Sequence, residues 1–261
     1  MDLLNTIERQ HEIVRLTNTK GKVAVIELAQ RFGVSEVTIR SDLAVLDAKK
    51  LLIRSRGGAM VNDDLSRELS LKEKKQKNSE LKQRLGTAVA ALIRDDERII
   101  IDSGTTTEEV AANLRDHKNL VVMTNGLNIA VELSQLDKVE VLMTGGTLRK
   151  KSMSFYGAQA EQSLRHYQFD KLVLGADGFD IDTGLSTHFE AEANLNRLMC
   201  AAAREVIVVT DSSKFNRRCF HLVCQPSQVH TLVTDSGIPK EYAEQLVNMG
   251  VRVITIPLEN R

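Results

Sequence analysis

Five short loops rich in glycine, serine, threonine and aspartate carry the residue types best suited to chemistry. Glycine lets backbone amides approach a ligand, hydroxyl groups add hydrogen-bond donors, and a helix that starts in such a loop turns its positive end toward the same place. Together these features predict a pocket for an anion. Each loop follows a short apolar run, and the five span residues 102–107, 124–126, 144–147, 175–178 and 210–214.

The other side chains of these loops suit a small polyol or a sugar that carries a phosphate. Asn125 and three aspartates offer hydrogen-bonding groups for hydroxyls, and Lys214 supplies a cation. Any one of the loops is more simply explained as a turn and helix cap, but five at successive strand ends favour a binding site. The residues predicted to contact the ligand are Asp102, Ser103, Gly104, Thr105, Thr106, Thr107, Asn125, Gly126, Gly145, Gly146, Asp177 and Lys214.

Seven runs of apolar and β-branched residues predict the strands that position these loops. They cover residues 98–102, 120–124, 139–144, 171–176, 206–210, 231–234 and 251–256. Segments able to form helices separate most of them, at 108–114, 128–136, 190–203 and 240–249. Apolar strands that alternate with helices are typical of an α/β fold, a mainly parallel sheet covered on both faces, which binds ligands at the carboxyl ends of its strands.

The stretch from Phe32 to Leu46 predicts a different element, the turn and second helix of a helix-turn-helix. Gly33 supplies the backbone freedom of a tight turn, and Ser35 is expected to cap the following helix. The opposite face of the helix is short and polar and carries an arginine, which suits the DNA major groove; a surface helix packed on its neighbour is the alternative. Its buried face is predicted from three apolar residues at helical spacing, Ile39, Leu43 and Leu46.

Residues 51–60 predict a β-hairpin after that helix, the wing of a winged helix. Its two arginines could lie along phosphates or in the minor groove, and its two glycines let the backbone come close; a solvated edge hairpin is the alternative. The expected partner of this domain is double-stranded operator DNA. The residues predicted to contact it are Ser35, Glu36, Thr38, Arg40, Ser41, Arg54 and Arg56.

Charge is distributed unevenly along the 261 residues. The 35 basic and 35 acidic side chains balance overall, yet residues 1–84 hold 17 basic against 12 acidic, and the remainder holds 18 against 23. The basic end contains the helix-turn-helix, as expected for a module that meets phosphates. We therefore predict a winged helix-turn-helix DNA-binding domain at 1–60, a charged linker at 61–84 and an α/β ligand-sensing domain at 85–261.

Membrane, metal and cofactor functions are not expected. No apolar run approaches the roughly 20 residues of a membrane span, and the first ten residues lack the pattern of a signal peptide, which predicts a cytoplasmic protein. The cysteines are then expected to be reduced. Three of the possible metal ligands lie close in sequence, but their spacing matches no familiar zinc pattern: Cys219, His221 and Cys224.

Two longer connections, residues 154–157 and 184–188, are expected to edge the pocket. His188 and Glu190 invite an acid/base interpretation. A lone histidine near the start of a helix is more often structural, so no catalytic residue is predicted.

The sequence resembles the DeoR family of bacterial transcriptional regulators over essentially its whole length. The motifs that carry the resemblance are Val-Ser-Glu-Val-Thr-Ile-Arg-Ser-Asp-Leu with Arg-Gly-Gly-Ala downstream, Asp-Ser-Gly-Thr-Thr-Thr, Thr-Asn-Gly, Thr-Gly-Gly-Thr-Leu-Arg and Asp-Ser-Ser-Lys-Phe-Asn-Arg. The resemblance implies a C-terminal domain similar to ribose-5-phosphate isomerase, used as a sensor of phosphorylated sugars. Many members have a second arginine after the position of Arg40, where this chain has Ser41, so an operator preference does not carry over.

Within that family, the stretches Ser-Phe-Tyr-Gly, Leu-Ser-Thr-His and Asp-Ser-Ser-Lys-Phe-Asn-Arg most resemble regulators of N-acetylgalactosamine and galactosamine use, with regulators of glucitol or galactitol operons as close competitors.

Two functions compete. One is a repressor, expected to be a homodimer or homotetramer, that a phosphorylated sugar releases from its operator. The other is a sugar-phosphate isomerase or deaminase with an appended DNA-binding module. The repressor is favoured because an enzyme has no physical need for a winged helix, whereas coupling the two sites gives the fusion a purpose.

Overall fold

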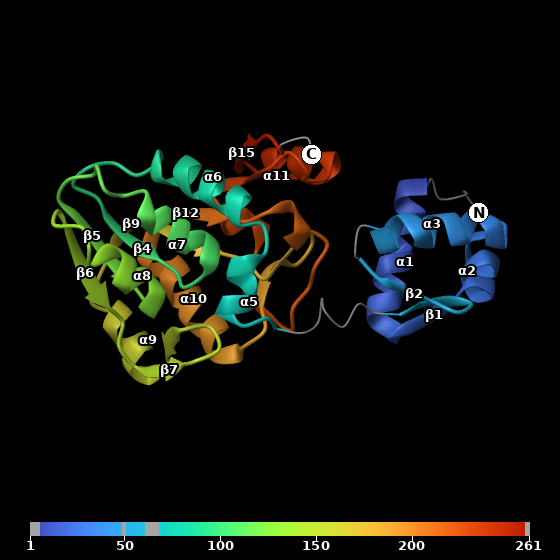
Figure 1. The fold of residues 1–261 in the computed structure, drawn as a ribbon, viewed down its shortest axis with the longest axis horizontal. Coiled ribbons are helices and arrows are strands. Elements are labelled where there is room, and N and C mark those ends of the chain that lie inside the picture. The colour runs from blue at the N-terminus through green and yellow to red at the C-terminus, as the bar shows by residue number, and fades with distance from the viewer. Residues whose placement is uncertain (1–5, 49–50, 61–67, 259–261) are drawn as a thin grey trace. The chain divides into compact units, whose positions relative to one another are not determined.

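A computed structural model shows two compact units along the chain, Met1–Glu68 and Leu69–Arg261, and describes residues 6–48, 51–60 and 68–258 (Figure 1). The sequence predicts a linker at 61–84 between them. Residues 61–67 of that linker lie outside the described residues. Residues 69–84 belong to the second unit, where Lys74 and Lys75 form ion pairs with Asp177 and Glu108, which lie far away in the sequence.

The first unit is a winged helix-turn-helix. Strands β1, β3 and β2 form an antiparallel sheet in that order, in which Ala59 is paired with Val23 on one side and Arg54 on the other. The predicted hairpin is therefore present and gains β1, the segment just before α2, as a third strand. The elements in chain order are α1 (Thr6–Lys20), β1 (Lys22–Ala24), α2 (Val25–Phe32), α3 (Glu36–Ala48), β2 (Ile53–Ser55) and β3 (Gly58–Met60).

Helix α3 is held in place by an apolar core and by one buried ion pair. Gly33 ends α2 in the left-handed region at φ 64°, a conformation that glycine adopts without the clash of a Cβ. On the buried side of α3, the Arg9 side chain donates from Nε to Asp42 at 2.7 Å. The expected core contacts of α3 are also present, since the structure buries Ile39, Leu43 and Leu46.

The second unit is an α/β domain built on a seven-stranded sheet. Its strands are β4 (Arg98–Ile101), β5 (Leu120–Thr124), β6 (Val139–Met143), β9 (Phe169–Gly175), β12 (Ala203–Val209), β14 (Thr231–Asp235) and β15 (Arg252–Ile256). All seven coincide with the predicted strands to within three residues at either end. Its helices are α5 (Leu71–Gln76), α6 (Ser79–Ala90), α7 (Thr105–Ala112), α8 (Leu127–Leu133), α9 (Ala158–Leu164), α10 (Glu190–Ala202) and α11 (Lys240–Asn248).

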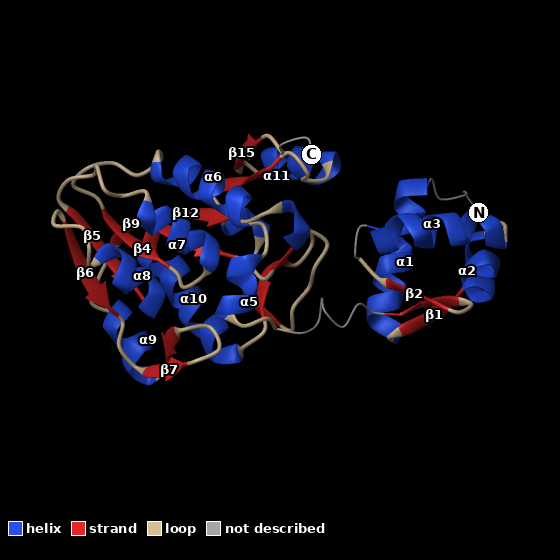
Figure 2. Cartoon of the chain, in the orientation of Figure 1, coloured by secondary structure: helices blue, strands red, loops and turns tan. Residues whose placement is uncertain are grey.

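Every neighbouring pair in this sheet is parallel, and helices cover both faces (Figure 2). Successive residues of a strand point to opposite faces. In β4, Ile99 and Ile101 accordingly enter a core that includes residues of α6, α7 and α8, whereas Ile100 enters a second core with residues of α9, α10 and α11. The strands are continuously apolar because both faces of the sheet are buried, as the sequence predicts.

The strand order is β15-β14-β12-β9-β4-β5-β6. After β4 the chain builds β5 and β6 on one side, and then returns to place β9 on the other side of β4. Open α/β sheets bind ligands at the point where the strand order reverses, outside the carboxyl ends of the strands. That point lies here between the loops that follow β4 and β9, which begin at Asp102 and Ala176.

Two small sheets lie beside the main one. A hairpin pairs β7 (Thr147–Arg149) with β8 (Ser154–Tyr156), and a three-stranded sheet orders β10 (Gly178–Asp180), β11 (Gly184–Thr187) and β13 (His221–Cys224). They contain the two connections that the sequence places at the pocket edge.

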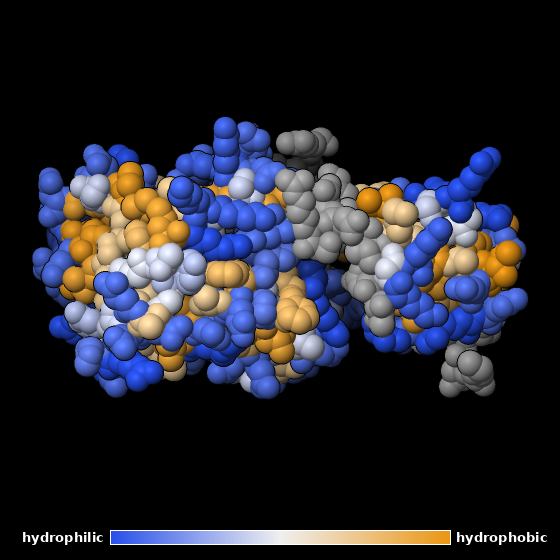
Figure 3. All heavy atoms as spheres, turned by 90° about the horizontal axis from the view of Figure 1, so that it is seen from below, coloured by the Kyte–Doolittle hydropathy of each residue, from blue (hydrophilic) through white to orange (hydrophobic). Residues whose placement is uncertain are grey.

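The face shown in Figure 3 is largely polar, interrupted by separate apolar patches. The most exposed large apolar side chain among the described residues is Phe220, at 88% of its full exposure. Within the described ranges, the structure contains no helix long and apolar enough to cross a membrane.

Candidate DNA-binding and effector-binding sites

Helix α3 presents a short exposed face. Ser35 caps it as expected, because its Oγ accepts a hydrogen bond from the Thr38 amide at 3.1 Å. The Arg40 guanidinium pairs with the Glu36 carboxylate at 2.7 Å, and Ser41 is exposed. Both members of the pair keep about half of their exposure, at 56% and 44%, so the pair is weak and Arg40 can exchange Glu36 for a phosphate or a guanine edge.

Val37 lies on the same face and was not predicted. Its side chain is 72% exposed, and it stands one helical turn before Ser41. An apolar residue is not expected on a polar face, but its spacing from Arg40 and Ser41 places Val37 between them on the helix surface. An exposed methyl-bearing side chain suits contact with a thymine methyl group.

The wing places both predicted arginines in solvent. Arg54 lies on β2 and Arg56 in the hairpin turn, and both are exposed. Gly57 has φ 81°, which the tight turn requires. Gly58 is needed for strand pairing: a Cβ there would lie 2.0 Å from the Val23 carbonyl oxygen and would break the pairing with β1. The close approach to DNA expected from the sequence stays a prediction.

The loops after β4 and β5 are joined to each other. The Ser103 amide donates to Asn125 Oδ1 at 2.9 Å, and Asn128 donates from Nδ2 to the Gly104 carbonyl at 3.1 Å. Gly104 is the N-cap of α7, so no side chain satisfies the first amides of that helix. An uncapped helix start faces the site with its positive end, as an anion site requires.

Several buried polar atoms near this helix start have no hydrogen-bond partner among the described residues. They are Thr107 Oγ1, Asn125 Nδ2 and Asn128 Oδ1. Buried polar groups are normally hydrogen-bonded, and an orphaned set at a strand end points to a ligand or water that completes it. Two of these residues, Thr107 and Asn125, are among those predicted from the sequence.

Asp177, in the loop after β9, is surrounded by cations. Lys74 of α5 donates to its Oδ1 at 2.5 Å, and Thr187 donates to its Oδ2 at 3.1 Å. Burial raises the pKa of Asp177, but the ammonium groups of Lys74 and Lys214 outweigh burial and hold the pKa below its ordinary value. Asp177 is therefore ionised at neutral pH.

Lys214 is half-buried and has no hydrogen bond or ion pair within 4 Å among the described residues. Burial lowers its pKa, partly offset by attraction to Asp177. An ammonium group in this position lacks a directly bound anion, which a ligand phosphate can supply.

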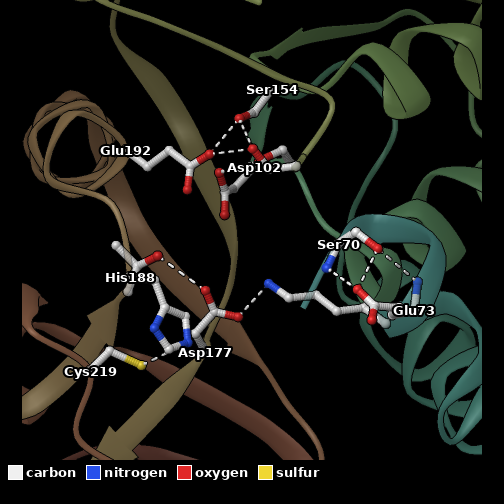
Figure 4. Close-up of polar contacts among 12 residues, drawn as sticks. Ser70, Glu73, Asp102, Ser154, Asp177, His188, Glu192 and Cys219 are labelled. Atoms are coloured by element: carbon white, nitrogen blue, oxygen red, sulfur yellow. Dashed lines mark hydrogen bonds and ion pairs between the residues drawn. The ribbon is translucent and has the colours of Figure 1, made fainter. Parts of the chain in front are cut away.

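Asp102 lies beside a second carboxyl group (Figure 4). Burial, reinforced by the charge of Glu192, raises the pKa of Asp102 to about 8. Glu192 accepts hydrogen bonds from Ser152 and Ser154 at 2.5 and 2.6 Å and pairs with Arg149 at 3.5 Å. Asp102 therefore keeps its proton at neutral pH and can donate a hydrogen bond to a ligand oxygen.

The glycines of the site differ in why the structure accommodates or requires glycine. Gly104 has φ 161°, an extended backbone open to any residue. Gly145 and Gly146 have φ 67° and 104°, and a Cβ on Gly146 would lie 2.5 Å from the Tyr156 carbonyl oxygen. Gly146 thus allows close packing against β8 and Gly145 allows close packing against Gln159 of α9, and a contact of either with a ligand stays a prediction.

The remaining predicted residues are distributed as follows. Thr105 is buried, Thr106 is half-buried, and Gly126 packs so closely that a Cβ there would lie 3.1 Å from Ser103 Cα. His188 contacts Cys219, with Nε2 3.5 Å from Sγ, whereas Glu190 is exposed. Across residues 6–48, 51–60 and 68–258, no cluster of three metal-ligating side chains is present.

Sequence reasoning missed Lys74 and Glu192. Lys74 falls in a charged run that is typical of a linker, and it meets Asp177 only because the chain folds back over 103 residues. Glu192 occupies one position of a helix that also carries Glu190, and nothing local distinguishes the buried glutamate from the exposed one.

Two family models match the chain. Residues 9–64 match the DeoR-like helix-turn-helix domain, and residues 77–236 match the DeoR C terminal sensor domain. The chain belongs to the DeoR family. The first match covers the winged helix-turn-helix unit, and the second covers most of the α/β unit, including the strand-switch point of its main sheet. The resemblance seen in the sequence is thereby confirmed, and the protein is a DNA-binding transcriptional regulator rather than an enzyme.

DeoR-type regulators align with almost the whole chain. A protein of Escherichia coli O157:H7, named as a proposed transcriptional repressor of the aga operon, is 46% identical over 253 residues, which cover 96% of this chain and 94% of that protein. The glycerol-3-phosphate regulon repressor of Escherichia coli K12 is 30% identical over 246 residues, covering 94% and 97%. Ribose 5-phosphate isomerase A from Methanocaldococcus jannaschii is 16% identical with a TM-score of 0.40, over 53% of this chain and 55% of that one.

Proposed function

We propose that this regulator represses a catabolic operon for an amino sugar or a hexitol, and that the phosphorylated sugar releases it from its operator. The observation that carries the proposal is the half-buried ammonium group of Lys214, which has no ion pair among the described residues and attracts Asp177 at the strand-switch point, where α7 starts uncapped. A phosphate satisfies both features at once.

The phosphate is assigned to the amides and hydroxyls of residues 103–107 together with Lys214. The sugar end then meets Asp102, Asn125 and Asp177. A neutral Asp102 can donate to a sugar oxygen, an ionised Asp177 can accept from a hydroxyl or an ammonium group, and Asn125 Nδ2 is a donor without a partner in the described structure. This combination supports a polyhydroxylated phosphate ester over inorganic phosphate alone.

The names of relatives support the same class of ligand. One is assigned to the aga operon, and another to the glycerol-3-phosphate regulon, which is named for a phosphorylated polyol. Relatives of this kind are repressors, and this chain aligns with both of them over more than nine-tenths of its length.

Operator recognition is assigned to α3 and to the wing. The contacts proposed are Arg40, Ser41 and Val37 in the major groove, with Arg54 and Arg56 on phosphates or in the minor groove. One winged helix reads too few base pairs for selectivity in a genome, so a homodimer or homotetramer is proposed to bind repeated half-sites.

The test begins with an operator selected by the purified protein from random-sequence duplexes. Fluorescence anisotropy then follows operator release by galactosamine 6-phosphate, glucosamine 6-phosphate, glucitol 6-phosphate, glycerol 3-phosphate and inorganic phosphate, each beside its unphosphorylated form where one exists. We expect at least one sugar or polyol phosphate to release DNA at concentrations where inorganic phosphate and the unphosphorylated compound do not. Equal potency of a phosphorylated sugar and its unphosphorylated form would contradict the phosphate site.

A further inference from the structure

Helix α5 is the first helix of the second unit, and it is not held by a hydrophobic core. None of its six residues is buried. A capping box fixes its start, in which the Ser70 amide donates to the Glu73 carboxylate at 2.8 Å and Ser70 Oγ accepts from the Glu73 amide at 3.3 Å. A short charged helix of this kind keeps its position through its polar contacts with neighbours.

Those contacts attach α5 to three segments around the proposed pocket. Lys74 binds Asp177 after β9, and Lys75 binds Glu108 of α7 at 2.6 Å. The Leu71 amide donates to the Lys151 carbonyl, between β7 and β8, at 2.9 Å. Figure 4 shows Asp177 beside His188 and Cys219. Helix α5 is therefore attached to the binding site, and the Lys74 carbonyl also accepts a hydrogen bond from Lys82 of α6.

The Lys74–Asp177 pair is sensitive to a further anion in the pocket. Its side chains retain only 23% and 15% of their exposure, so solvent screens the pair incompletely. Lys214 also attracts Asp177, and the start of α7 is open to an anion. A bound phosphate dianion repels the Asp177 carboxylate and attracts the Lys74 ammonium, which weakens the attachment of α5.

We propose that Lys74 and Asp177 form an effector-operated latch: the bound sugar phosphate draws Lys74 away from Asp177 and frees α5, through which the chain connects to the DNA-binding unit. This inference rests on the proposed function. A ligand shifts a conformational equilibrium only by its differential affinity for the two states, and the loss of this ion pair in the ligand-bound state supplies that difference. Lys74 is thus a positioning residue that couples the two sites.

The test measures coupling separately from binding, in the full-length chain. Titration calorimetry gives the dissociation constant for galactosamine 6-phosphate and for glucitol 6-phosphate, with and without saturating operator. In the wild type we expect the operator to weaken sugar-phosphate binding by about 5- to 150-fold. Lys74→Met removes the charge and keeps the apolar stem. Because it frees α5 without ligand, it should weaken operator binding toward that of the ligand-bound wild type and reduce that ratio to about 2 or less.

Two control variants accompany Lys74→Met. Lys74→Arg retains the cation and should keep the wild-type ratio, and Lys72→Met removes an exposed lysine from the same helix and should also keep it. Hydrogen exchange gives a second readout. Sugar phosphate should accelerate exchange of the α5 amides in the wild type, whereas in Lys74→Met these amides should exchange fast without ligand.

The outcomes separate the two proposals. If neither sugar phosphate binds the wild type with an operator-dependent affinity, the proposed function fails and the latch fails with it. If the wild type shows coupling and Lys74→Met shows the same ratio with the same α5 exchange, the latch is overturned and the proposed function stands. Loss of coupling in Lys74→Met and in Lys72→Met alike would overturn the specific role of Lys74.

Discussion

Asn125 Oδ1 accepts a hydrogen bond from the Ser103 amide at 2.9 Å, and this bond fixes the loop after β5 against the loop after β4. Asn125→Ala leaves the Ser103 amide without its acceptor in a partly buried place. We expect a loss of roughly 1–3 kcal/mol in the free energy of unfolding, together with a weaker response to sugar phosphate. Urea denaturation measures the first effect. Asn248→Ala, on an exposed position of α11, is the control and should change stability little.

Arg40 and Arg54 should differ in how they affect DNA binding. Arg40→Ala should cost roughly 1–3 kcal/mol at the selected operator and relax the preference at one base pair, because it is assigned to a base edge. Arg54→Ala should weaken all duplexes about equally and reduce the salt dependence, because it is assigned to phosphate. Anisotropy with operator and scrambled duplexes distinguishes them, and Arg115→Ala in the second unit is the control. Unchanged affinity in both variants would remove these faces from the interface.

The start of α7 should be essential for the ligand and dispensable for DNA. A Cβ on residue 104 would lie 3.0 Å from Thr107 Oγ1, and the extended backbone there accepts a branched residue, so Gly104→Val should fold and obstruct the pocket. We expect the sugar-phosphate concentration for operator release to rise about tenfold or more, a change of about 1.4 kcal/mol. Lys214→Ala should act in the same direction without adding bulk.

The control for these two variants is Lys118→Ala, which removes an exposed lysine before β5, at the opposite end of the sheet. Its response to sugar phosphate should match the wild type. A folded Gly104→Val protein that releases operator at the wild-type concentration would place the pocket elsewhere.

Asp102 should make stability depend on pH. Burial and Glu192 raise its pKa from 3.8 to about 8, so the folded protein holds a proton that the unfolded chain releases, and wild-type stability falls as pH rises between those values. Asp102→Asn stays neutral throughout. We expect its unfolding free energy, relative to wild type, to rise by roughly 1–3 kcal/mol from pH 5 to pH 8. Urea unfolding at several pH values checks this, with the exposed Asp137→Asn as the control; a pH-independent difference would contradict the raised pKa.

The sequence predicts those elements whose formation is determined by residues close together in the chain. The strands of the main sheet are continuous apolar runs, and α3 is marked by Gly33, by Ser35 and by three buried residues at helical spacing. Their boundaries follow from turn and cap chemistry. The strand-end loops were found for the same reason, since each combines glycine with hydroxyl side chains within a few residues.

Contacts between distant parts of the chain could not be predicted in this way. Arg9 and Asp42 form a buried pair across 33 residues, and each alone has the appearance of a surface charge. Lys74 was placed in a linker for the same reason. Whether a polar residue of a short helix has a partner depends on which distant loop folds against that helix. A single sequence does not reveal which loop that is.

The position of β4 between β5 and β9 has a consequence for synthesis of the chain. The ribosome releases β4, β5 and β6 before β9, so a nascent chain that ends before Phe169 presents one long edge of β4 with unpaired amides and carbonyls. The same chain carries the loop after β4 but not Asp177 or Lys214. Sugar phosphate therefore cannot assist early folding, and protection of that edge depends on rapid arrival of β9 or on a chaperone.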